Sequence, residues 1–362
     1  MPCEEENHGH DPTDGRSIHM NHLISCVDAL FENKTVGNLI VRVGRGEEIL
    51  IDLTRTEQDR RLSDYTLFDM ASVTKIMATT TLALMAMDRG TLSPGDRVSR
   101  FFSVPGDKQC LTIKHLMTHT MGIGHKNLTG CADGYADIAR YILDIPADIP
   151  IGTDVRYSCP GFILLGCILE KLFDCPLNEA FDSLVATPLG LENTAFLPNA
   201  ALDFVNANRR AADAGMVNDY NCRYLGGVCG NAGLFSCLED MTRYVRFLQT
   251  KGAPLISPEI FARACRNHTA GMSESRGLGY LYVDDRYMQT GGLFREGSIG
   301  HCGHTGQSVF VDTQSGLYAI ILSDATVSTV RKYGKEKYSE VTQMRRDLHA
   351  AIRADLNGSN TL

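Results

Sequence analysis

The chain has 362 residues, of which 43% are hydrophobic and 22% are charged, and its formal net charge is -8 at pH 7. This composition is that of an ordinary soluble globular protein, long enough for one large domain or two intertwined lobes. The acidic balance, with no block of Lys and Arg, argues against a nucleic-acid partner, because phosphate binding needs a cationic face.

The N-terminus, the apolar runs and the cysteines bear on cellular location. The chain starts with an acidic, polar stretch unlike a secretory leader, and its longest apolar run, residues 76–87, is too short and too threonine-rich to span a bilayer. Twelve cysteines are scattered along the chain, many in apolar contexts such as Cys167, which favours reduced, buried thiols over a disulfide scaffold. We therefore expect a cytoplasmic protein without a membrane span.

The N-terminal part is expected to form an arm, a helix and a hairpin. Residues 1–16 have the composition of a flexible arm, and the apolar spacing over residues 18–31 is helical. Two β-rich runs follow, Leu39 to Val43 and Glu48 to Leu53, joined through Gly44-Arg45-Gly46. These glycines indicate a turn and not a phosphate loop, because no helix follows them.

The middle of the chain, from about 66 to 265, is dominated by helical patterns. Helices are expected at 73–89, 112–118, 134–144, 160–173, 178–187 and 239–250. The last part returns to strands, which are expected at 277–284, 307–312 and 317–324, with a turn at 312–316 and a helix near 337–354.

Strands at both ends with helices between them predict the fold class. We expect an α/β (α+β) protein with one antiparallel sheet built from both termini and flanked by helices. Residues 17–362 are expected to form a single domain, in which a mostly helical lobe (about 66–265) is inserted into an α/β lobe formed by 17–65 and 266–362.

Ser72-Val73-Thr74-Lys75 is the first candidate for chemistry. A Ser-x-x-Lys pattern arises by chance roughly once in a chain of this length, so the four residues alone are weak. Their context is stronger, because Ser72 directly precedes an apolar helical run and Lys75 follows one turn later. Burial is expected to lower the pKa of Lys75, so that its amine accepts a proton from Ser72 or holds the hydroxyl in place. The alternative is an N-cap serine beside a snorkelling lysine.

Two further segments support a site. Tyr157 and Ser158 lie on a Pro-Gly-punctuated loop before another apolar helix, where a phenol beside a lysine can shuttle protons. His304-Thr305-Gly306 stands at the entry to an expected strand. Gly306 allows close approach to the backbone, and the N–H of the next residue, Gln307, can stabilise an oxyanion.

Together these residues carry a family resemblance. Ser72-Val73-Thr74-Lys75, Tyr157-Ser158-Cys159 and His304-Thr305-Gly306 resemble the three ordered motifs of the serine β-lactamase and penicillin-binding protein superfamily, most closely its class C-like esterases, D,D-peptidases and D-aminopeptidases. Other segments are similar to that branch: LFDMASVTKIMAT, GTLSPGDRVSRFF, LTIKHLMTHTMGIG, VRYSCPGFILLGCILEKL and LGGVCGNAGLFSCLEDMTRYVRFL. The similarity extends from about residue 35 to 325 and implies the β-lactamase/transpeptidase-like fold.

The resemblance implies a role for each motif residue. Ser72 is the acylated nucleophile, Lys75 its activating partner and Tyr157 the proton relay. The backbone N–H groups of Ser72 and Gln307 form the oxyanion hole, and the third motif lines the substrate-carboxylate side through His304, Thr305 and Gly306. The implied reaction is acyl transfer to water or another acceptor, without a metal or an organic cofactor.

Two departures from class C enzymes bear on the substrate. Cys159 stands where those enzymes have an asparagine whose amide engages the acylamido group of the antibiotic, and a thiol is a weak hydrogen-bonder. His304 replaces a lysine and is largely neutral near pH 7, so an anionic substrate is held less firmly. Both changes favour an esterase, amidase or peptidase acting on small ester, amide or peptide substrates. The alternative is a penicillin-binding or sensor protein that is acylated at Ser72 and turns over little.

Several other residues are alternative candidates for chemistry. His115 and His119 stand four apart like metal ligands, but no glutamate follows His115 as a zinc protease requires. Cys159 is an alternative nucleophile, and the segment from Asn218 to Cys222 forms either a polar wall of the cleft or a loop held by its own side chains. Four N-terminal histidines are expected in a solvated tail and could capture a transition metal: His8, His10, His19 and His22.

Overall fold

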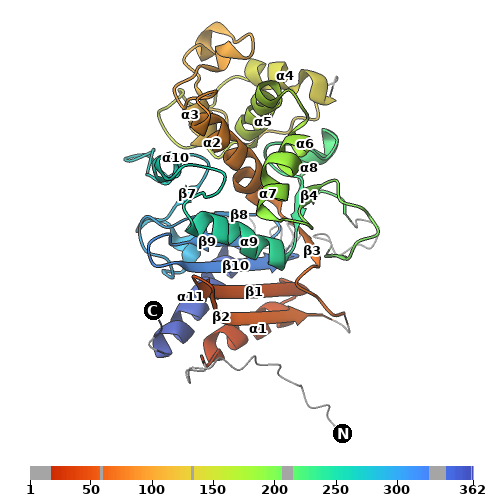
Figure 1. The fold of residues 1–362 in the computed structure, drawn as a ribbon, viewed down its shortest axis with the longest axis vertical. Coiled ribbons are helices and arrows are strands. Elements are labelled where there is room, and N and C mark those ends of the chain that lie inside the picture. The colour runs from red at the N-terminus through yellow and green to blue at the C-terminus, as the bar shows by residue number, and fades with distance from the viewer. Residues whose placement is uncertain are drawn as a thin grey trace.

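A six-stranded antiparallel sheet forms the base of the molecule (Figure 1). The computed structural model describes residues 18–57, 60–131, 134–205, 215–325, 340–359 and 361. The strand order is β2-β1-β10-β9-β8-β7. The strands are β1 (Asn38–Arg45), β2 (Glu48–Thr56), β7 (Leu281–Tyr282), β8 (Ile299–Cys302), β9 (Ser308–Val311) and β10 (Leu317–Ser323).

The sheet joins the two ends of the chain, as predicted. The expected hairpin is present, with β1 antiparallel to β2 and Gly46 at a φ of +61° in the turn. On its other side β1 pairs antiparallel with β10, Val41 opposite Ile321. The long connection between these paired strands leaves room for the helical part of the chain.

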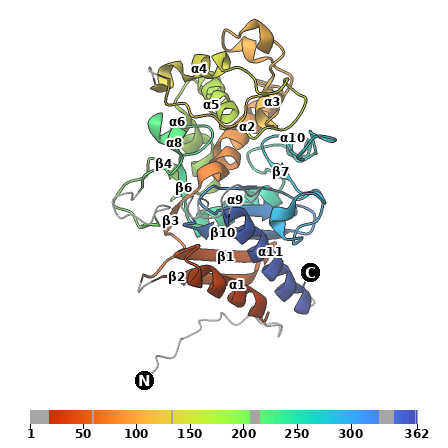
Figure 2. The ribbon, with the colours of Figure 1, turned by 180° about the vertical axis from the view of Figure 1, so that it is seen from behind.

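Side chains of the central strands alternate between two hydrophobic cores. Leu39, Val41 and Val43 of β1 point into a core shared with α1 (Asn21–Glu32) and α11 (Glu340–Gly358). Ile40 points into the larger core on the opposite face, which α9 (Leu238–Gln249) covers. Figure 2 shows α1 and α11 side by side on the face turned away in Figure 1.

The entry of α1 is capped by a residue from the far end of the chain. Asp355 in α11 accepts hydrogen bonds from the backbone N–H groups of His22 (3.0 Å) and Leu23 (2.9 Å), and from His22 Nδ1 (2.8 Å). Two of the orphan donors of the first helical turn are thereby satisfied in place of a local side-chain cap. His22 thus belongs to a structural contact, whereas the predicted arm 1–16, with His8 and His10, lies outside the described residues.

The helical region stands above the sheet and contains a second, four-stranded sheet of order β4-β6-β3-β5 (Figure 1). Its strands are β3 (Leu67–Asp69), β4 (Ala195–Phe196), β5 (Phe204–Val205) and β6 (Leu234–Ser236). Its helices are α2 (Thr81–Asp88), α3 (Ile113–Met117), α4 (Ile138–Asp144), α5 (Cys159–Phe173), α6 (Leu177–Phe181), α7 (Thr187–Leu189), α8 (Tyr220–Tyr224) and α10 (Pro258–Ala264).

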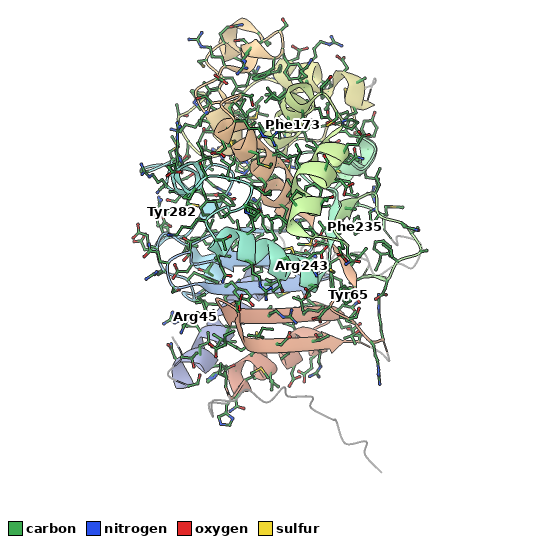
Figure 3. All side chains as sticks on the ribbon, in the orientation of Figure 1. Arg45, Tyr65, Phe173, Phe235, Arg243 and Tyr282 are labelled. Atoms are coloured by element: carbon green, nitrogen blue, oxygen red, sulfur yellow. The ribbon has the colours of Figure 1, made fainter. Side chains whose placement is uncertain are left out.

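Labelled side chains mark the two parts of the molecule (Figure 3). Phe235 on β6 meets Phe204 edge to face, with ring centroids 5.6 Å apart, inside the larger core. Arg45 at the end of β1 donates a hydrogen bond of 2.7 Å to the carbonyl of Thr361 and so holds the C-terminal segment against the sheet. Within the described ranges, no helix combines the length and apolar character needed to cross a membrane.

Several short elements differ from those expected. The strand predicted at 277–284 is reduced to Leu281–Tyr282, and the strand Ile299–Cys302 was not predicted. The small sheet and helices α8 and α10 were also missed. Strands of two to four residues have too few positions for an alternating pattern to stand out, so only their neighbours in space define them.

Candidate active site

Ser72 lies in a short turn, Ala71–Val73, that contacts β8 of the large sheet and precedes the segment that ends in α2. The single helix expected over 73–89 is instead a 3-10 turn at Ala71–Val73, a π-helix at Lys75–Thr80 and then α2. Ala71 has a φ of +45°, a strained conformation for a residue with a Cβ, and its N–H is held by Asp69 Oδ1 at 2.8 Å. The strain sits directly before Ser72, as it often does at functional sites.

Lys75 and Tyr157 both reach the Ser72 hydroxyl. Lys75 Nζ donates to Ser72 Oγ at 2.9 Å, and the Tyr157 hydroxyl donates to the same oxygen at 2.7 Å. Lys75 is fully buried and also donates to the carbonyl of Asn231 at 2.9 Å. The structure therefore brings together the serine, the lysine and the tyrosine that the sequence suggested.

The charge state of this group differs from the one expected from burial alone. Burial lowers the pKa of Lys75, but the neighbouring Cys159 and Tyr157 outweigh burial and raise it. Burial raises the pKa of Tyr157, and the attraction of Lys75 offsets only part of that effect. At neutral pH the resting site thus holds a lysine ammonium and a neutral phenol.

Cys159 opens α5 beside the lysine. Its Sγ lies 3.7 Å from Lys75 Nζ, and the Ser158 hydroxyl caps the helix by accepting from the N–H of Gly161 at 3.1 Å. Burial acts to raise the pKa of the Cys159 thiol, but the Lys75 charge and a hydrogen bond with His125 lower it overall. The thiol thus lies beside the lysine amine.

The β8–β9 turn closes the site from the sheet side. Gly303 lies so close to the backbone before Ser72 that a Cβ there would be 2.9 Å from the carbonyl oxygen of Met70. Thr305 Oγ1 donates to the carbonyl of Asp69 at 3.1 Å and also contacts Gln307 Oε1. The Thr305 hydroxyl therefore holds the β8–β9 turn against the end of β3, just before Ser72.

Gly306 and His304 play different parts in this turn. Gly306 has a φ of +97°, and a Cβ there would lie 2.0 Å from Ser323 Oγ, so packing requires a glycine. His304 is exposed at the tip of the turn. Partial burial and the nearby Arg345 lower the pKa of His304, so its imidazole is neutral at pH 7.

The segment around Asn218 is tied to two sides of the site. The N–H of Asn218 donates to Asp69 Oδ2 at 2.6 Å. Asn221 accepts from the N–H of Leu128 at 2.9 Å and donates to the carbonyl of Lys126 at 2.8 Å, which joins α8 to the loop that carries His125. The segment is thus held by its own polar groups, and α8 begins within it behind the Asp219 cap, whereas a polar wall of the cleft stays a prediction.

Three residues next to Tyr157 were not expected there. His119, a candidate metal ligand in the sequence, packs against Tyr157 with the two rings tilted and their centroids 4.5 Å apart, and it accepts from the N–H of Ser158 at 3.0 Å. His301 lies 6.3 Å from the same ring, and the Arg276 guanidinium lies 5.7 Å from its centroid. In the sequence, only His301 carries a signal of this placement, because it stands three residues before His304 of the third motif.

Asp69 also went unrecognised, although it directly precedes the Ser72 turn. Its carboxylate binds the N–H groups of Ala71 and Asn218, and its burial raises its pKa to about 6. His115, the other candidate metal ligand, accepts instead from the N–H of Thr112 at 3.1 Å and caps α3.

Comparison with known proteins identifies the family of the chain. The beta-lactamase family model matches residues 23–342. Esterase EstB of Burkholderia gladioli is 29% identical over 87% of this chain and 93% of its own, and an N-acetylmuramyl-L-alanine amidase of Bacillus subtilis (strain 168) is 26% identical over 73% of this chain and 69% of its own. A penicillin-binding protein homologue from Caulobacter crescentus has a similar fold, with a TM-score of 0.72 and 16% identity over 93% of this chain and 97% of its own. The chain belongs to the beta-lactamase family.

Proposed function

We propose that the protein is a serine hydrolase that acts through an acyl-enzyme at Ser72. The observation that carries the proposal is the pair of hydrogen bonds that Ser72 Oγ receives, from Lys75 Nζ at 2.9 Å and from the Tyr157 hydroxyl at 2.7 Å. A serine hydroxyl is a weak nucleophile until a neighbouring group takes its proton. Here the lysine and the tyrosine are the two groups within reach of that proton.

The proton path follows from the shared contacts. In the active form the Lys75–Tyr157 pair has lost one proton, so it accepts the Ser72 proton as Oγ attacks the substrate carbonyl carbon. Tyr157 then donates a proton to the leaving alkoxide or amine as its bond to the carbonyl breaks. In the second half the pair takes a proton from water, the resulting hydroxide attacks the acyl carbon, and Ser72 Oγ leaves with a proton.

The oxyanion of each tetrahedral intermediate is proposed to bind the backbone N–H groups of Ser72 and Gln307. This assignment is supported by the contact of the 303–307 turn with the backbone directly before Ser72. Thr305 serves by anchoring the turn, Gly306 by permitting its conformation, and His304 faces the substrate as a neutral group. Preorganised donors of this kind commonly supply the largest stabilisation of the transition state.

The substrate is proposed to be a small ester or amide, handled in the manner of a class C-type esterase or peptidase. Cys159 presents no amide to an acylamido group, and neutral His304 adds no fixed cation for an anionic substrate. The names of the relatives, an esterase and an amidase, agree with this class. Acylation at Ser72 with little turnover, as in a penicillin-binding or sensor protein, is the second candidate and is compatible with the same contacts.

A cytoplasmic location is proposed on the strength of the thiols. Cysteines with free thiols lie buried in the larger hydrophobic core, among them Cys167, Cys222, Cys229 and Cys237. Persistent free thiols are typical of a reducing compartment.

Turnover of p-nitrophenyl butyrate tests the proposal directly. We expect p-nitrophenol release to continue far beyond one equivalent of enzyme. Mass spectrometry of protein quenched during turnover and then digested should show a butyryl adduct on the peptide containing Ser72. A burst of one equivalent followed by arrest favours the sensor function. Release without an adduct on that peptide contradicts a Ser72 acyl-enzyme.

The pH dependence is expected to follow the raised pKa values of Lys75 and Tyr157. The active form has one proton fewer than the resting pair, and a raised pKa moves the loss of that proton to higher pH. We therefore expect kcat/KM to increase nearly tenfold per pH unit between about pH 7 and 9. The measurement is a kcat/KM profile corrected for spontaneous hydrolysis, and a maximum below pH 7 contradicts this assignment.

Replacing Cys159 with asparagine is expected to shift selectivity towards acylamido substrates. One added hydrogen bond should raise kcat/KM for a penicillin, relative to p-nitrophenyl butyrate, by up to about tenfold. The control is Cys159→Ala, which removes the thiol beside Lys75 without adding an amide. Equal selectivity in the two variants would show that the side chain at this position does not contact the acyl group.

A further inference from the structure

Arg276 carries a buried positive charge against the ring of Tyr157. Its guanidinium carbon lies 5.7 Å from the ring centroid, and only 4% of the residue is exposed. Lys75 Nζ lies 5.0 Å from the same centroid. A cation near an aromatic ring is attracted to it, and the attraction is greatest when both groups are removed from water.

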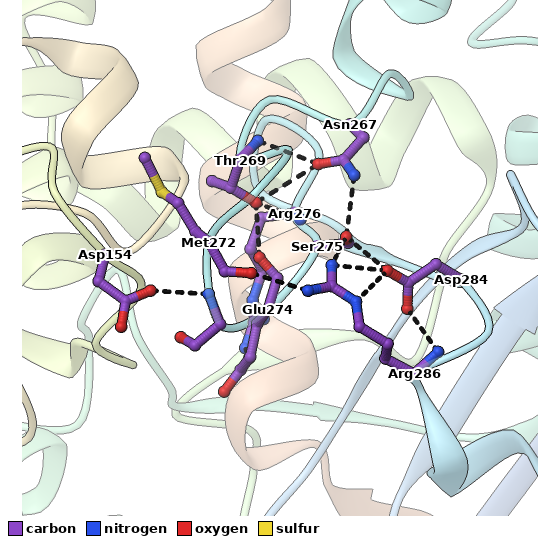
Figure 4. A network of polar contacts seen from close by, with 10 residues as sticks. Asp154, Asn267, Thr269, Met272, Glu274, Ser275, Arg276, Asp284 and Arg286 are labelled. Atoms are coloured by element: carbon purple, nitrogen blue, oxygen red, sulfur yellow. Dashed lines mark hydrogen bonds and ion pairs between the residues drawn. The ribbon is translucent and has the colours of Figure 1, made fainter.

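The backbone around Arg276 is fixed by hydrogen bonds of its own loop (Figure 4). Its N–H donates to Thr269 Oγ1 at 2.9 Å, and its carbonyl accepts from the N–H of His268 at 2.7 Å. Thr269 Oγ1 in turn donates to the carbonyl of Glu274 at 2.7 Å. The backbone of Arg276 is thus held by hydrogen bonds within the loop that connects α10 to β7.

The same loop is hydrogen-bonded to the segment that precedes Tyr157. Asp154 Oδ1 accepts from the N–H of Ser273 at 2.7 Å, as Figure 4 shows. On the other side Ser275 Oγ donates to Asp284 Oδ2 at 2.7 Å, and Arg286 Nη2 donates to Ser275 Oγ at 2.7 Å. Both partners of the cation–ring contact are therefore held by one network.

The charge of Arg276 is only partly neutralised. Its Nη2 pairs with Glu274, whose side chain is 48% exposed and so screened by solvent. The Nε of Arg276 is buried without a hydrogen-bond partner in the described part of the chain. The remaining charge acts on the groups around the Tyr157 ring.

Those groups come from several elements. Burial, reinforced by the charges of Arg276 and Lys75, keeps the pKa of His119 and of His301 well below the ordinary value, so both rings are neutral. Among the described residues, the titratable and charged side chains recorded near Tyr157 are Lys75, Arg276, Cys159, His119 and His301. Of these only Lys75 and Arg276 are cations that stabilise the phenolate of Tyr157, and Lys75 is needed at Ser72.

We infer that Arg276 is a positioning residue for Tyr157, which holds the phenol ring towards Ser72 and stabilises its ionised form during proton transfer. The catalytic consequence of this inference rests on the proposed serine hydrolase function. The contact between Arg276 and the Tyr157 ring can be tested without turnover. Arg276 thus places a fixed positive charge over the Tyr157 ring. His304, at the third motif, supplies no such charge because its imidazole is neutral.

The first test measures the ionisation of Tyr157 without catalysis. The protein is labelled with 3-fluorotyrosine, which lowers the pKa of every tyrosine, and titrated by fluorine NMR, the Tyr157 signal being the one absent from Tyr157→Phe. We expect Arg276→Met to raise the Tyr157 midpoint by about one pH unit and Arg276→Lys to raise it much less. An unchanged midpoint in Arg276→Met overturns the inference, whether or not the protein turns over esters.

The second test compares the pH dependence of kcat/KM between variants of two arginines in the same hydrogen-bond network. Arg276→Met should lower kcat/KM for p-nitrophenyl butyrate at pH 7 about tenfold and move the acid limb to higher pH by the same unit. The matched control is Arg286→Met, which loses contacts in the same loop but no contact with Tyr157. An equal shift of the pH profile in Arg286→Met would show a merely structural effect and would overturn the inference. If the unmodified protein shows no turnover that depends on Ser72, the proposed function is overturned instead, and the NMR titration alone decides the ring contact.

Discussion

Replacing Ser72 with alanine is expected to reduce kcat/KM for p-nitrophenyl butyrate by about 10⁴-fold or more. The substitution removes the oxygen that receives hydrogen bonds from Lys75 and Tyr157, and with it the atom that becomes acylated. Lys75 keeps its hydrogen bond to the carbonyl of Asn231, so the buried charge does not lose every partner. We therefore expect the fold and the melting temperature to be nearly unchanged.

The control for this variant is Ser103→Ala, an exposed serine away from the site. It should retain full activity, and the Ser72→Ala protein should also lose the butyryl adduct in mass spectrometry. If Ser72→Ala hydrolyses the ester at the rate of the unmodified protein, the nucleophile is elsewhere, and Cys159 becomes the first residue to test.

Replacing Tyr157 with phenylalanine is expected to lower kcat by about 10²- to 10⁴-fold. The change removes only the hydroxyl that donates to Ser72 Oγ at 2.7 Å and retains the ring that packs on His119 and beside Lys75. Both half-reactions lose their proton relay, so single-turnover measurements should show slow acylation and slow deacylation. The loss should be smallest for activated esters, whose leaving group needs little protonation.

The matched control is Tyr135→Phe, which removes a phenol that donates to Glu170 at 2.9 Å in the helical region. That variant should retain its kcat and its pH profile even if its stability falls. A Tyr157→Phe protein with a kcat within a few fold of the unmodified protein would assign the proton relay to Lys75 alone.

Local patterns were sufficient for the main elements of the fold. The hairpin was predicted from β-rich runs flanking glycines, and α5 and α9 were predicted from apolar periodicity. These features depend on neighbours in the chain, so a single sequence contains them. The short strands β3, β4, β5, β6 and β8 were missed because each is defined by a partner strand that its own residues do not reveal.

The backbone at the nucleophile shows a second limit. The apolar run after Ser72 predicts one helix, whereas the chain there is a 3-10 turn followed by a π-helix, with Ala71 at positive φ. The turn is held by Asp69, which also binds the backbone N–H of Asn218. A strained turn held by a carboxylate that also binds a backbone N–H far along the chain has no signature in local propensity.

The sequence by itself determined the chemistry that is available: one serine spaced three residues from a lysine, a tyrosine before a buried helix, and a glycine turn beside a strand. Spacing along one helical turn and the order of motifs are local properties, so these residues could be named in advance. Only the tertiary structure decided their charge states and their partners. The pKa of Lys75 is raised and not lowered, because Cys159 and Tyr157 surround an amine whose burial alone would act in the opposite direction. Arg276 meets Tyr157 only because a loop from another part of the chain is fastened beside it, and electrostatic interactions in a buried site depend on distance through space and not on separation in sequence.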